Sequence, residues 1–152
     1  MKKIVALTDD AALLTIDVSS TVSADRAYRT ERVSLQAIDD GALRSGSVVN
    51  LHANGPKVYA QERYLLNGAL PNHASMIVLS VHLFEPDCAG PAAPFFDIPI
   101  STNAAGNGQA QAPTVPPEAV EGLAGEHGVN WIVYDDGGTA VHETGCEDVV
   151  LD

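Results

Sequence analysis

Basic side chains are absent from more than half of the sequence. Residues 64–152 contain twelve Asp and Glu but no Lys or Arg, and the whole chain of 152 residues has a formal net charge of −12. Such a charge repels phosphate backbones and anionic membrane surfaces, so nucleic acid is not expected as a partner. Clustered carboxylates could instead bind Ca²⁺, but the sequence has no Asp-x-Asp-x-Asp-Gly loop, and a solvated acidic surface is the favoured interpretation.

Long hydrophobic runs are also absent. No segment approaches the roughly 18 apolar residues of a membrane-spanning helix, so membrane insertion is not expected. The start, "MKKIVALTDD", has an apolar stretch of only five residues, which is shorter than the about 7–15 of a secretory signal. Either the protein is not exported, or it is extracellular or at the cell surface and the given chain lacks its signal peptide.

Only two cysteines occur, Cys88 and Cys146. They lack the Cys-x-x-Cys spacing, so a zinc or redox site is not expected, and no metal or cofactor is predicted. Each cysteine lies beside glycine or proline at the end of an expected strand, which favours a Cys88–Cys146 disulfide and an oxidising, extracellular compartment. Two unrelated free thiols, as in a cytosolic protein, are the alternative.

Apolar and polar residues alternate with a period of two between clusters of Gly, Pro, Asn and Asp, which is typical of β-strands. About ten short strands predict an all-β fold, an antiparallel immunoglobulin-like sandwich or barrel, as a single domain over residues 1–152. One short helix is expected near residues 117–123, where "VPPEAVEGLAG" begins with prolines and ends with glycine. The expected strands are Lys3–Thr8, Leu13–Val18, Glu31–Ala37, Ser47–His52, Lys57–Leu66, Ser75–Phe84, Phe95–Ser101, Gly108–Pro113, Val129–Tyr134, Thr139–Thr144 and Asp148–Leu151.

The closing stretch, "WIVYDDGGTAVHETGCEDVVLD", predicts a hairpin that completes the core. Asp136 and Gly137 suit a two-residue turn, which would pair Trp131 with His142. Trp131 is expected in the core, and His142 lies on the same buried face. A bulge at Gly145 would then turn the apolar side chains of the last strand inward.

No catalytic residues are predicted. Ser45 and Ser101 lack the context of a nucleophile elbow, and the glycines of "AAGNG" do not open a helix that could bind phosphate. Glu62 and Arg63 point to opposite faces of a strand and are expected to face solvent or to pair across strands. The chain is therefore predicted not to be an enzyme.

Four segments carry a resemblance: "RYLLNGALPNHASMIVLSVHLF", "CAG", "TNAAGNGQAQAPTVPPEAVEGLAGEHGVNW" and "TGCEDVVLD". Over roughly residues 60–152 they look like a group of uncharacterised secreted bacterial proteins with an immunoglobulin-like β-sandwich. More loosely, the layout is similar to the chordin-type repeat and to superoxide-dismutase-like sandwiches. The resemblance implies an exported β-sandwich and brings no activity with it.

A copper-zinc centre of the superoxide-dismutase type is not expected. Such a centre needs a His-x-His pair, and the five histidines of this chain never have that spacing. The expected hairpin register pairs His127 with Cys146, on the same face as His142, but a disulfide-bonded cysteine cannot be a thiolate ligand. An exposed loop position for His127 and a hydrogen-bonded, packed His142 are therefore favoured over a metal site.

A non-catalytic extracellular domain for interaction or assembly, with an unknown protein or cell-surface partner, is the favoured function. Self-association into a homo-oligomer is part of this hypothesis, because "KKIVALT" could add to the edge of a neighbour's sheet. The alternative is a small-molecule- or metal-binding protein with a pocket at one end of the sandwich, or an unrecognised enzyme. Fold alone does not decide between these functions.

Overall fold

The computed structural model describes residues 4–7, 13–16, 28–53, 60–115, 118 and 120–151. Eleven strands overlap the predicted ones, which confirms the all-β class. The short helix expected near residues 117–123 is not seen in the described part of that segment. Leu123 N donates to Val120 O at 3.0 Å in a turn, and Gly122 has a φ of 85°, which is incompatible with a continuing helix. Among the described residues, no helix is long and apolar enough to span a membrane.

The strands form two sheets. β1 (Ile4–Leu7) and β2 (Leu13–Ile16) pair only with each other, in a two-stranded sheet. The nine-stranded sheet consists of β3 (Tyr28–Ala37), β4 (Ser45–Ala53), β5 (Ala60–Asn67), β6 (Ala74–His82), β7 (Ala93–Ser101), β8 (Gly108–Gln111), β9 (Gly125–Asp135), β10 (Ala140–Glu143) and β11 (Glu147–Leu151). Because this sheet begins at Tyr28, the single domain over residues 1–152 stays a prediction.

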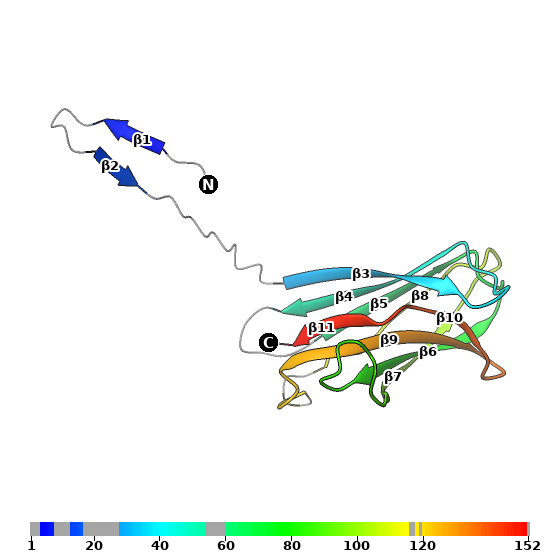
Figure 1. Cartoon of the computed structure of the whole chain (residues 1–152). Coiled ribbons are helices and arrows are strands. Elements are labelled where there is room, and N and C mark those ends of the chain that lie inside the picture. The colour runs from blue at the N-terminus through cyan, green and yellow to red at the C-terminus, as the bar shows by residue number, and fades with distance from the viewer. Residues whose placement is uncertain are drawn as a thin grey trace.

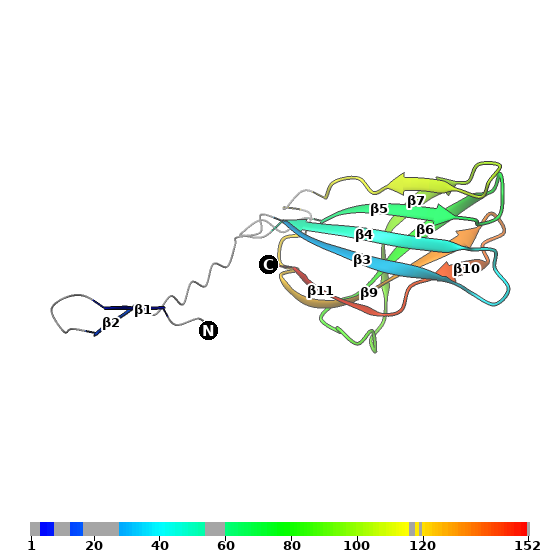
Figure 2. The same ribbon diagram turned by 90° about the horizontal axis from the view of Figure 1, so that it is seen from above.

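The nine strands form a flattened, nearly closed barrel. Their order is β7-β6-β9-β10-β3-β4-β5-β8, and β11 pairs with β9 beyond the end of β10. Figures 1 and 2 show two layers, one with β3, β4, β5 and β8 and the other with β6, β7, β9, β10 and β11. The pairing of β10 with β3 joins the layers on one side. On the other side a bridge between Thr102 and Gly108 connects the ends of β7 and β8, so the barrel is nearly closed.

The core lies between the two layers and follows the alternation of the strands. Ile77 and Leu79 of β6 are buried, whereas Met76 on the opposite face is exposed. Trp131 of β9 is 1% exposed, which confirms its predicted place in the core. Other buried side chains of this core are Leu35, Val48, Tyr64, Leu66, Val129, Val133 and Val149.

The C-terminal hairpin forms with a different register from the predicted one. His142 pairs with Val133 instead of Trp131, after an irregularity between Ala140 and His142. The turn itself is longer than two residues, because the Asp135 carboxylate accepts a hydrogen bond from Thr139 N at 2.7 Å. An Asp side chain that binds backbone in this way stabilises a turn by itself, and nothing in the alternation of the strands reveals it.

β10 and β11 both pair with β9, but their registers differ by one residue, as expected for a bulge near Gly145. The shift turns Val149 toward the core, where it is 4% exposed. Val149 is also the residue that pairs with His127. The prediction that His127 pairs with Cys146 is therefore wrong.

The loop between β6 and β7 is fastened at two points. Cys88 is bonded to Cys146 across a separation of 58 residues, and this is the predicted disulfide. His127 binds the same loop through Nδ1, which accepts from Phe84 N at 3.1 Å, while Nε2 donates to Leu123 O at 2.6 Å. His127 is only 1% exposed, so its predicted position in an exposed loop is wrong.

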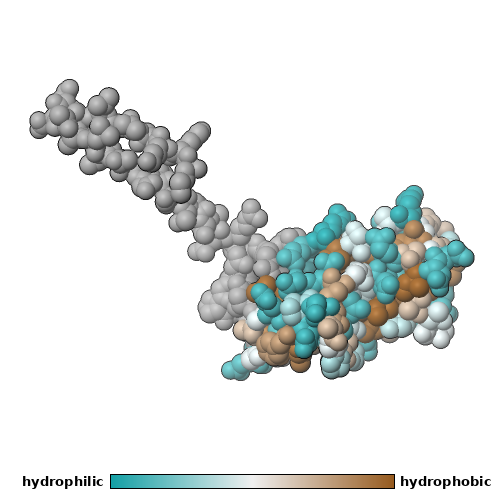
Figure 3. Space-filling view, viewed as in Figure 1, coloured by the Kyte–Doolittle hydropathy of each residue, from teal (hydrophilic) through white to brown (hydrophobic). Residues whose placement is uncertain are grey.

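The described surface is mixed in polarity. Figure 3 shows hydrophilic side chains over much of one face, with hydrophobic areas between them. The large apolar side chains that are exposed are Leu70, Met76, Leu83, Phe84 and Phe95. Leu70 lies at a pocket.

Candidate functional site

A pocket of about 190 Å³ opens at one end of the barrel. The segments that surround it are the β3–β4 connection, the β5–β6 turn, the end of β7 and the β9–β10 hairpin. Its walls are mainly apolar. The polar residues that line it are His73, Ser75, Thr102, Asp135 and His142.

The β5–β6 turn and the turn between β7 and β8 are distant in sequence but pack together beside the pocket. In "NGALPN", Gly68 and Asn72 have φ values of 65° and 51°, in the left-handed region that glycine and asparagine tolerate. Ala69 N donates to Gly106 O, and Asn72 N donates to Asn103 O, both at 3.0 Å. A side chain at Gly106 would clash, because its Cβ would lie 2.1 Å from Ala69 O. The backbone at this end of the barrel is therefore fixed by close contact between the turns.

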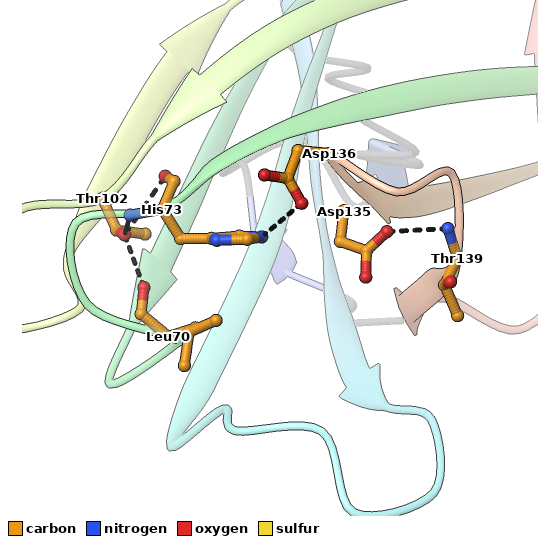
Figure 4. Close-up of polar contacts among 6 residues, drawn as sticks. All are labelled: Leu70, His73, Thr102, Asp135, Asp136 and Thr139. Carbon is orange, nitrogen blue, oxygen red and sulfur yellow. Dashed lines mark hydrogen bonds and ion pairs between the residues drawn. The ribbon is translucent and has the colours of Figure 1, made fainter.

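Thr102 ties the β5–β6 turn to the end of β7. Its Oγ1 accepts a hydrogen bond from His73 N at 3.0 Å and donates one to Leu70 O at 2.6 Å, as Figure 4 shows. The hydroxyl proton is thus used within the protein. What Thr102 and Leu70 can still offer to a ligand are oxygen lone pairs.

Two neighbouring carboxylates stand at the hairpin side of the pocket. Asp135 lines the pocket and uses Oδ1 to accept from Thr139 N. Asp136 Oδ1 lies 3.8 Å from His73 Nε2, and Figure 4 shows the imidazole pointing toward this carboxylate across the gap between the two turns. The Asp136 side chain is 75% exposed, so this contact is solvated and contributes little to stability.

His142 is the buried polar group of the site. It lines the pocket, is 4% exposed, and its Nδ1 has no hydrogen-bond partner within the described part of the chain. Burial lowers the pKa of His142, and the backbone of Val141 offsets this only in part. The ring is therefore neutral at neutral pH, with one nitrogen protonated and the other a lone-pair acceptor. A buried nitrogen without a partner costs free energy unless something binds to it.

Comparison with protein-family models found no match to the chain, and comparison with curated proteins found no significant match.

Of the residues that sequence patterns singled out, His142 lines the pocket and the others lie elsewhere. Cys88, Cys146 and Trp131 are outside the pocket lining. His127 and His142 share the inner face but lie far apart, because the residue opposite His142 is Val133, six positions along β9 from His127; that is about 20 Å in a strand. Among the described residues, no group of three or more His, Cys, Asp or Glu side chains is placed to hold a metal ion.

A second buried polar cluster lies in the core and not in the pocket. Glu62 of β5 is 2% exposed, so of its two expected positions the solvent-facing one is wrong. Its carboxylate accepts hydrogen bonds from Tyr64 OH and, at 2.8 Å, from Trp131 Nε1 of the opposite layer. Burial raises the pKa of Glu62, although the two hydrogen bonds oppose this change. Burial also raises the pKa of Tyr64, and the Glu62 charge adds to the effect, so Tyr64 stays neutral.

Asn50 supports a neutral Glu62. It lies directly opposite Glu62 on β4, is 3% exposed, and its Oδ1 has no hydrogen-bond partner among the described residues. Opposite side chains on paired strands are within reach of each other. A protonated Glu62 has a proton to donate, whereas a carboxylate has none. The cluster therefore fits a carboxylic acid that holds the two layers together.

Proposed function

We propose that the protein is a non-catalytic extracellular binding domain, and that the pocket at the end of the barrel holds a small molecule or a single side chain of a partner. The observation that carries this proposal is His142. It is a buried, neutral imidazole with an unpartnered nitrogen in an otherwise mainly apolar pocket. Ligand sites in proteins typically combine apolar walls with a few polar groups of this kind.

The volume of the pocket limits the ligand. Drug-sized molecules occupy about 300–1,000 Å³, whereas a dry cavity of about 150 Å³ holds one benzene ring. At about 190 Å³, the pocket accommodates a ring or short branched chain with one or two polar atoms. A larger partner could insert only one of its groups.

The polar groups at the pocket favour binding over catalysis. The Thr102 hydroxyl donates to Leu70 O, and Asp135 accepts from Thr139 N, so both are engaged in holding turns together. His142 lies inside β10, so the strand fixes the position of its backbone. Such groups can position a ligand without moving a proton.

An extracellular or cell-surface location is part of the proposal. The Cys88–Cys146 disulfide supports it, because disulfides persist in oxidising compartments. Membership in the secreted bacterial group with an immunoglobulin-like sandwich is likewise a proposal. The antiparallel layers and the bonded cysteines support it.

The pocket can be tested with small neutral probes and a variant that fills it. Benzyl alcohol and cyclohexanol should shift the backbone NMR signals of Leu70, Ser75 and Val141 at millimolar concentrations, the affinity range of such small ligands. Ser75 lines the pocket from β6, so Ser75→Ile should fill it and abolish these shifts. Ser80→Ile, on the same strand but outside the pocket, should leave them unchanged. Shifts that persist in Ser75→Ile, or that lie away from the pocket, would contradict the proposed site.

Self-association is a second candidate function, favoured by β1 and β2. Among the described residues, they form a sheet of two strands that pairs with no strand of the barrel. Two-stranded sheets alone are marginally stable in water. Pairing with the sheet edge of a second copy would add the missing hydrogen bonds.

A further inference from the structure

We infer that the pocket at the barrel end prefers a small organic cation, an apolar group that carries a protonated amine. This inference rests on the proposed function, since it names the ligand class of the same site. It follows from three properties of the pocket: Asp135, Thr102 and Leu70 present acceptor oxygens beside it, its surroundings are acidic, and its buried histidine is neutral.

The first property is the set of acceptors. Asp135 has a carboxylate in the lining, with Oδ1 bound to Thr139 N. Thr102 Oγ1 donates a hydrogen bond to Leu70 O, and both oxygens still have lone pairs. An ammonium group has three N–H donors and no acceptor, so it matches these groups. A carboxylate ligand has only acceptors, so it could not form hydrogen bonds with these oxygens.

The second property is the charge around the pocket. Asp135 lines it and Asp136 follows in the same hairpin turn. The β3–β4 connection, which also contributes to the lining, carries the exposed acids Asp39 and Asp40 and the exposed base Arg44. Acids therefore exceed bases at this end of the barrel. The resulting negative potential attracts cations and repels anions.

The third property is the state of His142. A protonated imidazole would repel a cation, but burial keeps this ring neutral. A neutral imidazole keeps one ring nitrogen as an acceptor, which a ligand N–H can use. Apolar walls formed by Leu66, Ala69 and Val141 can then contact the body of the ligand. A molecule with an apolar body and an amine satisfies both parts of the lining.

Three probes of nearly equal shape test the charge preference. Benzylamine, benzyl alcohol and benzoate differ in charge at pH 7 while sharing one phenyl ring. We expect benzylamine to bind about tenfold more tightly than benzyl alcohol, since charge-assisted hydrogen bonds are the stronger ones, and benzoate to bind most weakly. Dissociation constants from NMR titration at low ionic strength provide the comparison.

Asp135→Asn tests whether the charge of Asp135 is responsible for the preference for a cation. The variant removes the charge, but asparagine keeps the oxygen that accepts from Thr139 N. This variant should lower the affinity for benzylamine about tenfold and leave that for benzyl alcohol unchanged. Asp97→Asn, an exposed acid on β7 outside the pocket lining, removes the same charge and should change neither value by more than about twofold. If Asp135→Asn does not fold, as shown by loss of the native NMR spectrum, Asp136→Asn replaces it. The expected loss of affinity for benzylamine is then smaller.

The possible results separate the inference from the proposed function. Equal affinities for the amine and the alcohol, or tightest binding of benzoate, would overturn the cation preference while leaving the pocket as a binding site. Binding of none of the three probes would overturn both. A loss of benzylamine affinity in Asp97→Asn equal to that in Asp135→Asn would show a general charge effect, and would also overturn the inference.

Discussion

Glu62 is an acid in the core of the barrel, and its ionisation should lower the stability of the fold. Because its pKa in the folded state is raised above the ordinary value of 4.5, its contribution to stability is fully present below that pH. The contribution is lost as the pH rises through the folded pKa. Glu62→Gln removes the charge and keeps an oxygen for Tyr64 and Trp131, so it should raise the free energy of unfolding at pH 7 by about 1–3 kcal/mol. Urea denaturation at several pH values measures this difference, which should shrink toward zero below pH 4.5.

The matched control is Glu143→Gln, which makes the same change in net charge at an exposed position of β10. It should alter stability by less than about 0.5 kcal/mol. If Glu62→Gln were instead less stable than the original protein at pH 7, the hydrogen bonds from Tyr64 and Trp131 would have to favour the ionised acid strongly enough to outweigh its burial.

Residue type alone misplaces Glu62, because acids are rarely buried. One signal for its burial does exist in the sequence: Glu62, Tyr64 and Leu66 alternate on one face of β5, and the latter two are core residues. The hydrogen bond that makes burial tolerable comes from Trp131, 69 residues away. A contact of that range cannot be read from local spacing.

The loop between β6 and β7 depends on the disulfide that joins it to the start of β11. Replacing both cysteines with alanine opens a covalent loop closed across 58 residues. The entropy model predicts a loss of about 4 kcal/mol for a loop of this length. Urea denaturation of Cys88→Ala/Cys146→Ala measures the loss. An unchanged unfolding midpoint would show that His127 and the surrounding hydrogen bonds hold the loop without the disulfide.

The strands themselves are well predicted by alternation, since a half-buried strand requires a period of two. Their registers are less predictable. The β9–β10 register depends on the Asp135 carboxylate, which binds Thr139 N and lengthens the turn. A pocket at one end of the sandwich was among the alternatives, but its lining residues could not be named, because backbone contacts such as Ala69 N with Gly106 O bring its turns together.

Association of whole molecules should depend on β1 and on the net charge. If β1 adds to the edge of another copy, the chain should dimerise, and a charge of −12 should oppose this until salt screens it. We therefore expect the dimer fraction at about 0.1 mM protein to increase between low and physiological salt, as measured by sedimentation equilibrium. Val5→Lys places a charge in β1, which opposes edge pairing, and should reduce dimerisation. Ala37→Lys, an exposed position of β3, adds the same charge and should not. A chain that remains monomeric at both salt concentrations, or equal effects of the two lysines, would argue against assembly through β1.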